Sequence, residues 1–166
     1  LFDLGVDYFL GNAIPQNGSG TENINNSVHF RHPNGLGQWQ ESGRDQGHCT
    51  MGPQLTGVIC EIAWNQGIDL YGYKDNLVLS SVEYISKYNT WQEVPWVKYF
   101  YISGHPDGSQ SLWIQNTISS AGRGMLRPGW DLIYNHYVNR LGHAAPYTGQ
   151  YAELTRPEGG GMNYGG

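Results

Sequence analysis

The spacing of apolar residues between Gln46 and Gln66 restricts the fold more than any other feature of the chain. In this stretch apolar side chains recur at intervals of three and four residues, at Met51, Leu55, Val58, Ile59, Ile62 and Ala63. This period predicts an amphipathic helix that ends at Gly67, with Pro53 bending its first turns or setting a later start. A second stripe of the same period runs from Asn76 to Tyr88. Together the two segments predict a helical hairpin.

The remaining segments alternate between shorter helical patterns and long polar stretches. Residues 1–11 have the pattern of a helix end, residues 128–142 predict a helix, and residues 146–155 predict a short helix before Pro157. Residues 12–40 predict a long loop with a turn at His32-Pro33-Asn34-Gly35, and residues 90–127 a loop with one pair of strands. We therefore expect a mainly α fold with long loops and, over residues 156–166, a flexible Gly-rich tail.

Composition narrows the class of protein. The length is that of a single domain, which we expect to span residues 1–166. A net charge of −5 and the absence of any Lys/Arg cluster argue against nucleic-acid binding, and no apolar run is long enough for a membrane span. The chain begins in patterned sequence without a signal peptide, as mature or internal sequence does. Two glycosylation motifs, at Asn17 and Asn25, favour a secreted protein.

The two cysteines and the closely spaced histidines predict no metal site. Cys49 and Cys60 are separated by about 16 Å if they share one helix at about 1.5 Å per residue, which is too far for a disulfide. Buried free thiols are the favoured interpretation, and pairing of one thiol with another chain is the alternative. His136 and His143 are two helical turns apart, but no third ligand accompanies them.

Two segments carry the residue types that elimination from a uronic acid needs. That reaction removes the C5 proton beside a carboxylate, so cations or amides must neutralise the carboxylate and a Tyr or His must take the proton. Residues 40–48 bring together carboxylate, guanidinium, amide and imidazole groups at a predicted loop-to-helix junction. Residues 127–137 place Arg127 and Tyr134 two turns apart on one helix face.

The run Glu41-Ser42-Gly43-Arg44-Asp45-Gln46-Gly47-His48 resembles a motif of the alginate-lyase-like (α/α)-toroid polysaccharide lyases, which include bacterial glucuronan lyases and fungal relatives. The run from Ile62 to Gly72, Ile-Ala-Trp-Asn-Gln-Gly-Ile-Asp-Leu-Tyr-Gly, is also similar to that family. The resemblance extends from Leu1 to about Pro157, whereas the family domain is larger. It implies an incomplete toroid of helical hairpins, the middle or second part of a lyase domain, with a second chain possible as the carrier of the missing part.

The resemblance also implies roles for individual residues in cleaving an anionic polysaccharide without a metal or cofactor. His48 corresponds to the family's active-site histidine, Tyr134 to the tyrosine that acts as base and then acid, and Arg127 to its supporting arginine. Tyr137 competes with Tyr134 for the first role, and Arg123 with Arg127 for the second. Contacts to substrate are expected from Glu41, Arg44, Gln46 and Tyr137.

Other interpretations of the same residues remain open. If these residues have structural roles only, Arg44 and Asp45 pair with each other or cap a helix. In the same interpretation, Tyr134 belongs to an apolar stripe that packs into the core. A toroidal glycoside hydrolase would need two carboxyl groups, for which Glu41, Asp45 and Asp69 are candidates. A carbohydrate-binding protein without catalysis would use the six Trp and twelve Tyr residues for stacking.

Overall fold

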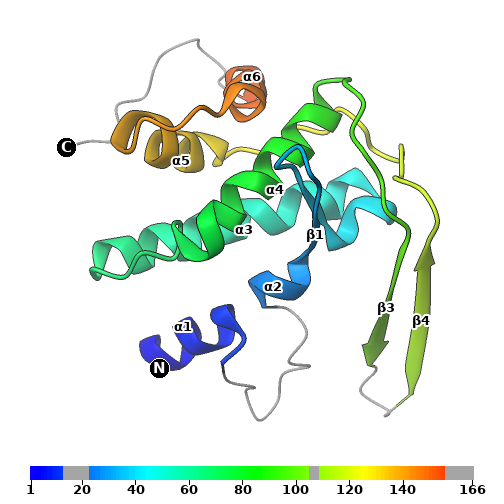
Figure 1. Ribbon diagram of the computed structural model, residues 1–166, viewed down its shortest axis with the longest axis horizontal. Coiled ribbons are helices and arrows are strands. Elements are labelled where there is room, and N and C mark those ends of the chain that lie inside the picture. The colour runs from blue at the N-terminus through cyan, green and yellow to red at the C-terminus, as the bar shows by residue number, and fades with distance from the viewer. Residues whose placement is uncertain (13–22, 105–108, 156–166) are drawn as a thin grey trace.

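Helix α3 (Gln46–Asn65) is the longest element of the fold, and helix α4 (Tyr73–Asn89) runs back along it (Figure 1). The structure is a computed structural model that describes residues 1–12, 23–104 and 109–155. Three left-handed residues, Lys74 to Asn76, interrupt the start of α4, so its regular part begins where the apolar stripe predicts. The predicted helical hairpin is confirmed.

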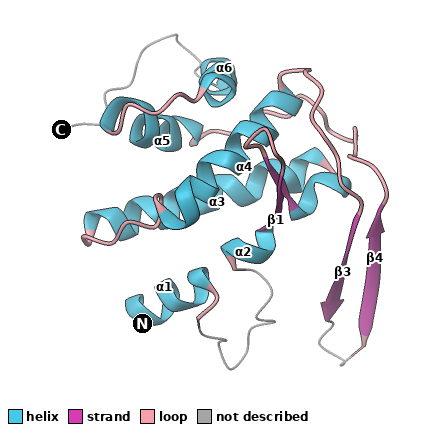
Figure 2. Cartoon of the chain, in the orientation of Figure 1, coloured by secondary structure: helices cyan, strands magenta, loops and turns pink. Residues whose placement is uncertain are grey.

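The other predicted helices are also present. Helix α1 (Phe2–Leu10) ends at Gly11, whose φ of 80° is the left-handed conformation usual after a helix. Helix α5 (Trp130–Tyr134) continues into the π-helical segment η2 (Asn135–Arg140), and α6 (Pro146–Thr155) packs against α4 and α5. Helices dominate the described chain (Figure 2), which confirms the mainly α class.

Two small antiparallel sheets complete the fold. Strands β3 (Tyr99–Gly104) and β4 (Gln110–Gln115) form the strand pair expected within residues 90–127. The expectation of a loop over residues 12–40 was wrong in its second half. Helix α2 (Ile24–Ser27), strands β1 (Val28–Arg31) and β2 (Gly37–Trp39), and the 3-10 turn η1 (Gln40–Gly43) lie there, and the predicted turn joins the two strands. The tail 156–166 and the Asn17 glycosylation motif lie outside the described residues.

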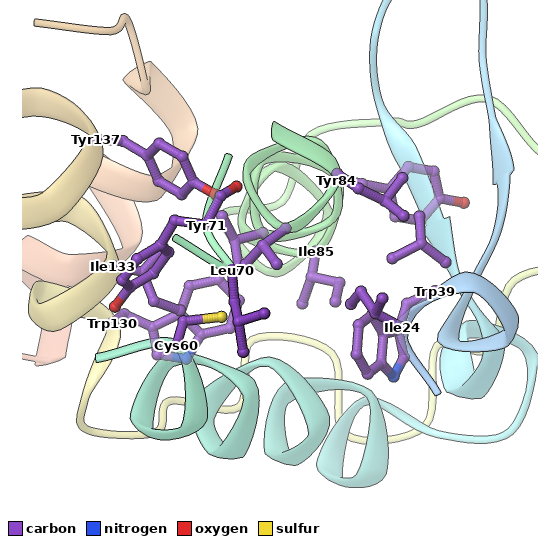
Figure 3. Close-up of a cluster of buried hydrophobic side chains, with 14 of the residues drawn as sticks. Ile24, Trp39, Cys60, Leu70, Tyr71, Tyr84, Ile85, Trp130, Ile133 and Tyr137 are labelled. Carbon is purple, nitrogen blue, oxygen red and sulfur yellow. The ribbon is translucent and has the colours of Figure 1, made fainter. Parts of the chain in front are cut away.

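The core lies between α3, α4 and α5 and extends to the β1–β2 pair (Figure 3). Aromatic rings fill much of it, and the largest fully buried side chains include Trp130, Tyr71, Tyr84 and Tyr137. Cys49 and Cys60 are both buried free thiols, as the spacing predicts. Burial raises the pKa of each thiol to about 12, so neither forms a reactive thiolate at neutral pH.

Helix α3 packs through its small residues rather than through the large residues of its apolar stripe. Thr56, Gly57, Cys60 and Ala63 are buried, and a side chain on Gly57 would meet Ile133 of α5 at 2.7 Å. Five residues of the stripe are instead exposed: Met51, Leu55, Val58, Ile59 and Ile62. The period predicts the helix correctly, but the large apolar residues that define it face away from the described core.

Within the described part of the chain, no helix is both long enough and apolar enough to cross a membrane. Asn25 is the asparagine of the glycosylation motif that lies within the described residues. Its side-chain amide forms hydrogen bonds to other parts of the fold. Its Nδ2 donates to the Leu10 carbonyl at 2.9 Å, and its Oδ1 accepts from the Tyr73 hydroxyl at 3.3 Å.

Candidate functional site

Asp45 and His48 form a paired carboxylate and imidazole at the start of α3. Asp45 caps the helix, accepting the backbone N–H of His48 through Oδ1 at 2.9 Å. Its other oxygen, Oδ2, lies 2.7 Å from Nδ1 of His48. An ionised carboxylate only accepts hydrogen bonds, so Nδ1 carries the proton and Nε2 presents a lone pair. Because the His48 side chain is 42% exposed, and Nε2 has no hydrogen-bond partner among the described residues, that lone pair is open to a ligand.

The ionised state of Asp45 has a physical cause. Partial burial alone would raise the pKa of its carboxyl group, but the hydrogen bonds from His48 and the positive charge of Arg44 outweigh that effect. The net result is a pKa below the ordinary value. This carboxylate therefore holds the His48 ring in one tautomer and one orientation, as a carboxylate bonded to a ring nitrogen commonly does.

Arg44 and Glu41 extend the charged group toward solvent. The Arg44 guanidinium lies 3.5 Å from Glu41 and 3.7 Å from Asp45, distances longer than those of a close ion pair. The Arg44 side chain is 43% exposed. The expected pairing of Arg44 with Asp45 and the capping of the helix are both confirmed. With its loose contacts, Arg44 keeps donors available for an anionic ligand beside His48.

Gln46 lies inside the protein and not at this surface. Its side chain is fully buried, and its Oε1 accepts from the Asn89 amide at 2.9 Å. Its Nε2 donates to the carbonyl groups of Ser119 and Ser42. The expected contact with substrate is therefore not available in this structure. Gln46 instead holds the start of α3 against the end of α4 and the loop of residues 119–127.

Arg127 reaches the same junction from that loop. Its Nε and Nη2 both donate to the carbonyl oxygen of Gly47, at 3.2 and 3.0 Å, and Nε also lies 3.1 Å from the Thr50 hydroxyl. The hydroxyl of Tyr151 accepts the backbone N–H of Arg127 at 2.8 Å. The structure thus brings Arg127 next to His48, as expected, where it supports the backbone that carries the imidazole.

Arg123, the alternative arginine, lies elsewhere. Its Nε donates to the Tyr88 carbonyl at 2.9 Å and its Nη2 to the Gln92 carbonyl at 3.0 Å, at the end of α4. Between the two arginines, the geometry favours Arg127 for a role at His48.

The two candidate tyrosines are not brought to His48. Tyr137 is fully buried, donates its hydroxyl proton to the Tyr71 carbonyl at 2.7 Å, and has a pKa raised by burial (Figure 3). Tyr134 packs against Gly149 of α6 and lines a separate pocket of about 400 Å³ with His143 and Glu153. Its neighbour Ile133 contacts α3 at Gly57, nine residues beyond His48 and hence about 14 Å along the helix.

Contacts from distant segments complete the site, and the sequence gives no local signal for them. Tyr99 donates its hydroxyl proton to the Gln40 carbonyl and accepts the Gly43 N–H at 3.2 Å, so β3 supports the turn before α3. Asn89 joins Gln46 to Gly124, whose N–H it accepts at 3.0 Å. Asn89 lies 43 positions from Gln46 and 35 from Gly124, and Tyr99 lies 59 positions from Gln40.

Within residues 1–12, 23–104 and 109–155, no three His, Cys, Asp or Glu side chains gather in a way that could hold a metal ion. Comparison with known proteins identifies no relative: the chain matches no family model, no curated protein and no solved structure.

Proposed function

We propose that the protein is a polysaccharide lyase that cleaves a 4-linked uronic-acid polymer, of the alginate or glucuronan type, by β-elimination. The observation that carries the proposal is the Asp45–His48 pair, which presents a basic, exposed Nε2 beside the loosely held guanidinium of Arg44. A base next to a cation is the combination that removal of a proton beside a carboxylate requires. The sequence resemblance of residues 41–48 to uronan lyases supports the same assignment.

In the proposed reaction, Nε2 of His48 takes the C5 proton while Arg44 neutralises the sugar carboxylate. The electron pair left at C5 forms the C4–C5 double bond as the bond from C4 to the linking oxygen breaks. The departing oxygen receives a proton from His48 or from water. Asp45 stabilises the imidazolium formed in between, and Arg127 holds the backbone at Gly47. His48 thus takes the role that the family resemblance assigns to Tyr134, because Tyr134 lies in a different pocket.

The lyase proposal is tested by incubating the purified protein with alginate and with glucuronan and following the near-ultraviolet absorbance of the new double bond. His48→Ala should lower turnover by about 10²- to 10⁴-fold, the usual contribution of a general base. Asp45→Asn retains a helix cap but places an amide N–H opposite Nδ1, which forces the proton onto Nε2 and should lower turnover similarly. His143→Ala, at an exposed histidine in the Tyr134 pocket, is the matched control and should retain activity.

Other results of these assays would contradict the lyase proposal or indicate a different catalytic residue. If neither polymer yields unsaturated ends, the lyase proposal is wrong. New reducing ends without absorbance would point to a hydrolase, for which Glu41→Gln would be the decisive variant. If Tyr134→Phe abolishes turnover and His48→Ala does not, the base is the tyrosine.

The toroid remains part of the same proposal. The described helices form one hairpin and a second pair, α5 and α6, beside it (Figure 1). We propose that they belong to an incomplete (α/α) toroid of a secreted protein, in which a second chain or segment supplies further hairpins.

A further inference from the structure

Trp91 occupies a backbone conformation that a tryptophan rarely adopts. Its φ is 66°, in the left-handed region, at the end of α4. Its N–H donates to the Tyr88 carbonyl and the N–H of Gln92 donates to the Lys87 carbonyl, both at 3.1 Å, which closes the helix. Glycine usually fills this position because it has no Cβ, and a bulky side chain there destabilises the fold.

Burial of the indole ring offsets little of this destabilisation. Trp91 is 71% exposed, the highest exposure among the six tryptophans of the chain. A tryptophan that strains the backbone while its apolar ring faces solvent does not stabilise the fold, so stability does not explain its presence at this position. Such positions are concentrated at functional sites.

The indole is nevertheless held in place. One ring edge packs on Gly124, where an added Cβ would approach the indole Cζ2 to 3.0 Å, and Gly124 itself has a φ of +85°. The Arg123 guanidinium lies 3.9 Å from the ring centre of Tyr88 and 5.4 Å from that of Trp91. Hydrogen bonds from Arg123 to two backbone carbonyl groups fix this cation beside the indole. The result is a rigid aromatic surface with a positive charge at its side.

This surface adjoins the His48 site through one loop. The N–H of Gln46 donates to the Ala121 carbonyl at 2.8 Å, and a Cβ on Gly47 would lie 3.4 Å from the sulfur of Met125. Gly124, on which the indole rests, belongs to the same loop and is tied to Gln46 through Asn89. The loop therefore connects the start of α3, where His48 lies, to Trp91.

We propose that Trp91 and Arg123 form a sugar-binding subsite, in which the indole stacks on a pyranose ring and the guanidinium attracts the carboxylate of that ring. A uronic-acid unit has both features, an apolar face of C–H groups and a negative charge, so the pair selects an anionic polysaccharide over a neutral one. The Arg123 side chain is 15% exposed and bonds Glu93 at 3.1 Å, and the Glu93 side chain is 84% exposed. A substrate carboxylate can displace such a surface partner at little cost. The inference rests on the proposed function, because it places the subsite next to the elimination site.

The test is affinity electrophoresis through gels that contain alginate, glucuronan or, as the neutral control, dextran. Trp91→Gly and Trp91→Leu should lower affinity for the uronic-acid polymers by about 3- to 10-fold, the range of one aromatic stacking contact. Trp91→Phe keeps a flat ring and should stay within about 2-fold of the parent. Thermal denaturation accompanies each variant, and Trp91→Gly should unfold at the same or a higher temperature, since it removes the strained tryptophan.

Separate measurements of polysaccharide binding and of turnover distinguish a failure of this inference from a failure of the proposed function. His48→Ala should still be retarded in the uronan gels although it forms no product. If turnover fails in every preparation while Trp91→Gly weakens binding, the subsite stands without the lyase. Retardation of Trp91→Gly or Trp91→Leu equal to that of the parent protein overturns the subsite, as does equal retardation of the parent in dextran.

Discussion

His136 shows how burial controls a single titratable residue in this protein. Its ring is fully buried, stacks on Tyr71 with ring centres 3.8 Å apart, and meets Trp64 edge-on at 4.7 Å. Its Nδ1 lies 3.4 Å from Arg140, and its Nε2 has no hydrogen-bond partner in the described part of the chain. Burial, reinforced by the charge of Arg140, lowers the pKa of His136 from 6.5 to about 4.

His136 should therefore make the protein sensitive to acid. As the pH falls below 6.5 the unfolded chain binds a proton at this residue, while the folded chain does not until about pH 4. The stability that neutral His136 contributes is present above pH 6.5 and is lost as the pH falls from 6.5 to about 4. The free energy of unfolding should fall by at most about 3 kcal/mol over this range. Urea denaturation at several pH values measures it. His136→Phe should flatten the dependence relative to the parent and to the exposed-site control His143→Phe; equal slopes in all three would contradict this account.

At the scale of single residues, the sequence predicts local contacts and misses distant ones. The cap by Asp45 depends on a spacing of three residues to His48, so the motif itself contains it. Gln46 follows Asp45 in the sequence, but its hydrogen-bond partners Asn89 and Ser119 lie 43 and 73 positions away. The burial of the Gln46 side chain depends on these distant partners. A polar side chain in such a motif has the same appearance in the sequence whether it binds substrate or joins two segments, and only the fold separates the two.

At the scale of elements, the contact between α3 and α5 depends on a glycine. Gly57 lies in the middle of α3 and is buried against Ile133, whose Cγ1 and Cδ1 atoms would be 2.7 and 2.9 Å from an added Cβ. These distances are shorter than carbon atoms tolerate, so the close approach of the two helices requires the missing side chain.

Gly57→Ala should destabilise the protein even though alanine is the better helix former. The gain in helix propensity, about 1 kcal/mol, is opposed by overpacking of about 1 to 3 kcal/mol, and we expect a net loss. Gly5→Ala in α1 is the matched control, because nothing lies within 4 Å of its added Cβ, and it should stabilise by about 0.5 to 1 kcal/mol. Urea denaturation compares the two variants. An equal gain in both would show that α3 and α5 are farther apart than described.

The elements differ in how well the sequence predicts them, for physical reasons. Helices α3 and α4 are long, so many residues repeat the same period and the pattern is clear. Strands β1 and β2 have four and three residues, too few for alternation to stand out among Asn and Gly. Their pairing relies instead on the turn at His32 to Gly35 and on packing against α4.

At the scale of the whole molecule, α3 has apolar surface on a side that the described elements cover only in part. Met51, Leu55, Val58, Ile59 and Ile62 are exposed along its length, and a groove of about 350 Å³ between α1 and α3 continues the apolar surface. A helix at the surface of a soluble domain normally turns polar residues outward. The expected second chain or segment of a larger toroid would remove this surface from water, and that expectation stays a prediction.

Polar substitutions on α3 measure whether this face is covered in solution. Leu55 and Ile62 are 55% and 53% exposed, so Leu55→Gln and Ile62→Gln should change the free energy of unfolding of the isolated chain by about 0.5 kcal/mol or less. Ile133→Ala, at a fully buried position, is the contrast and should cost about 2 to 5 kcal/mol. Light scattering after size-exclusion chromatography gives the mass of the same samples. A loss of about 2 kcal/mol or more at Leu55, together with a mass above that of one chain, would show that a second chain already covers α3, because only a buried leucine has that effect.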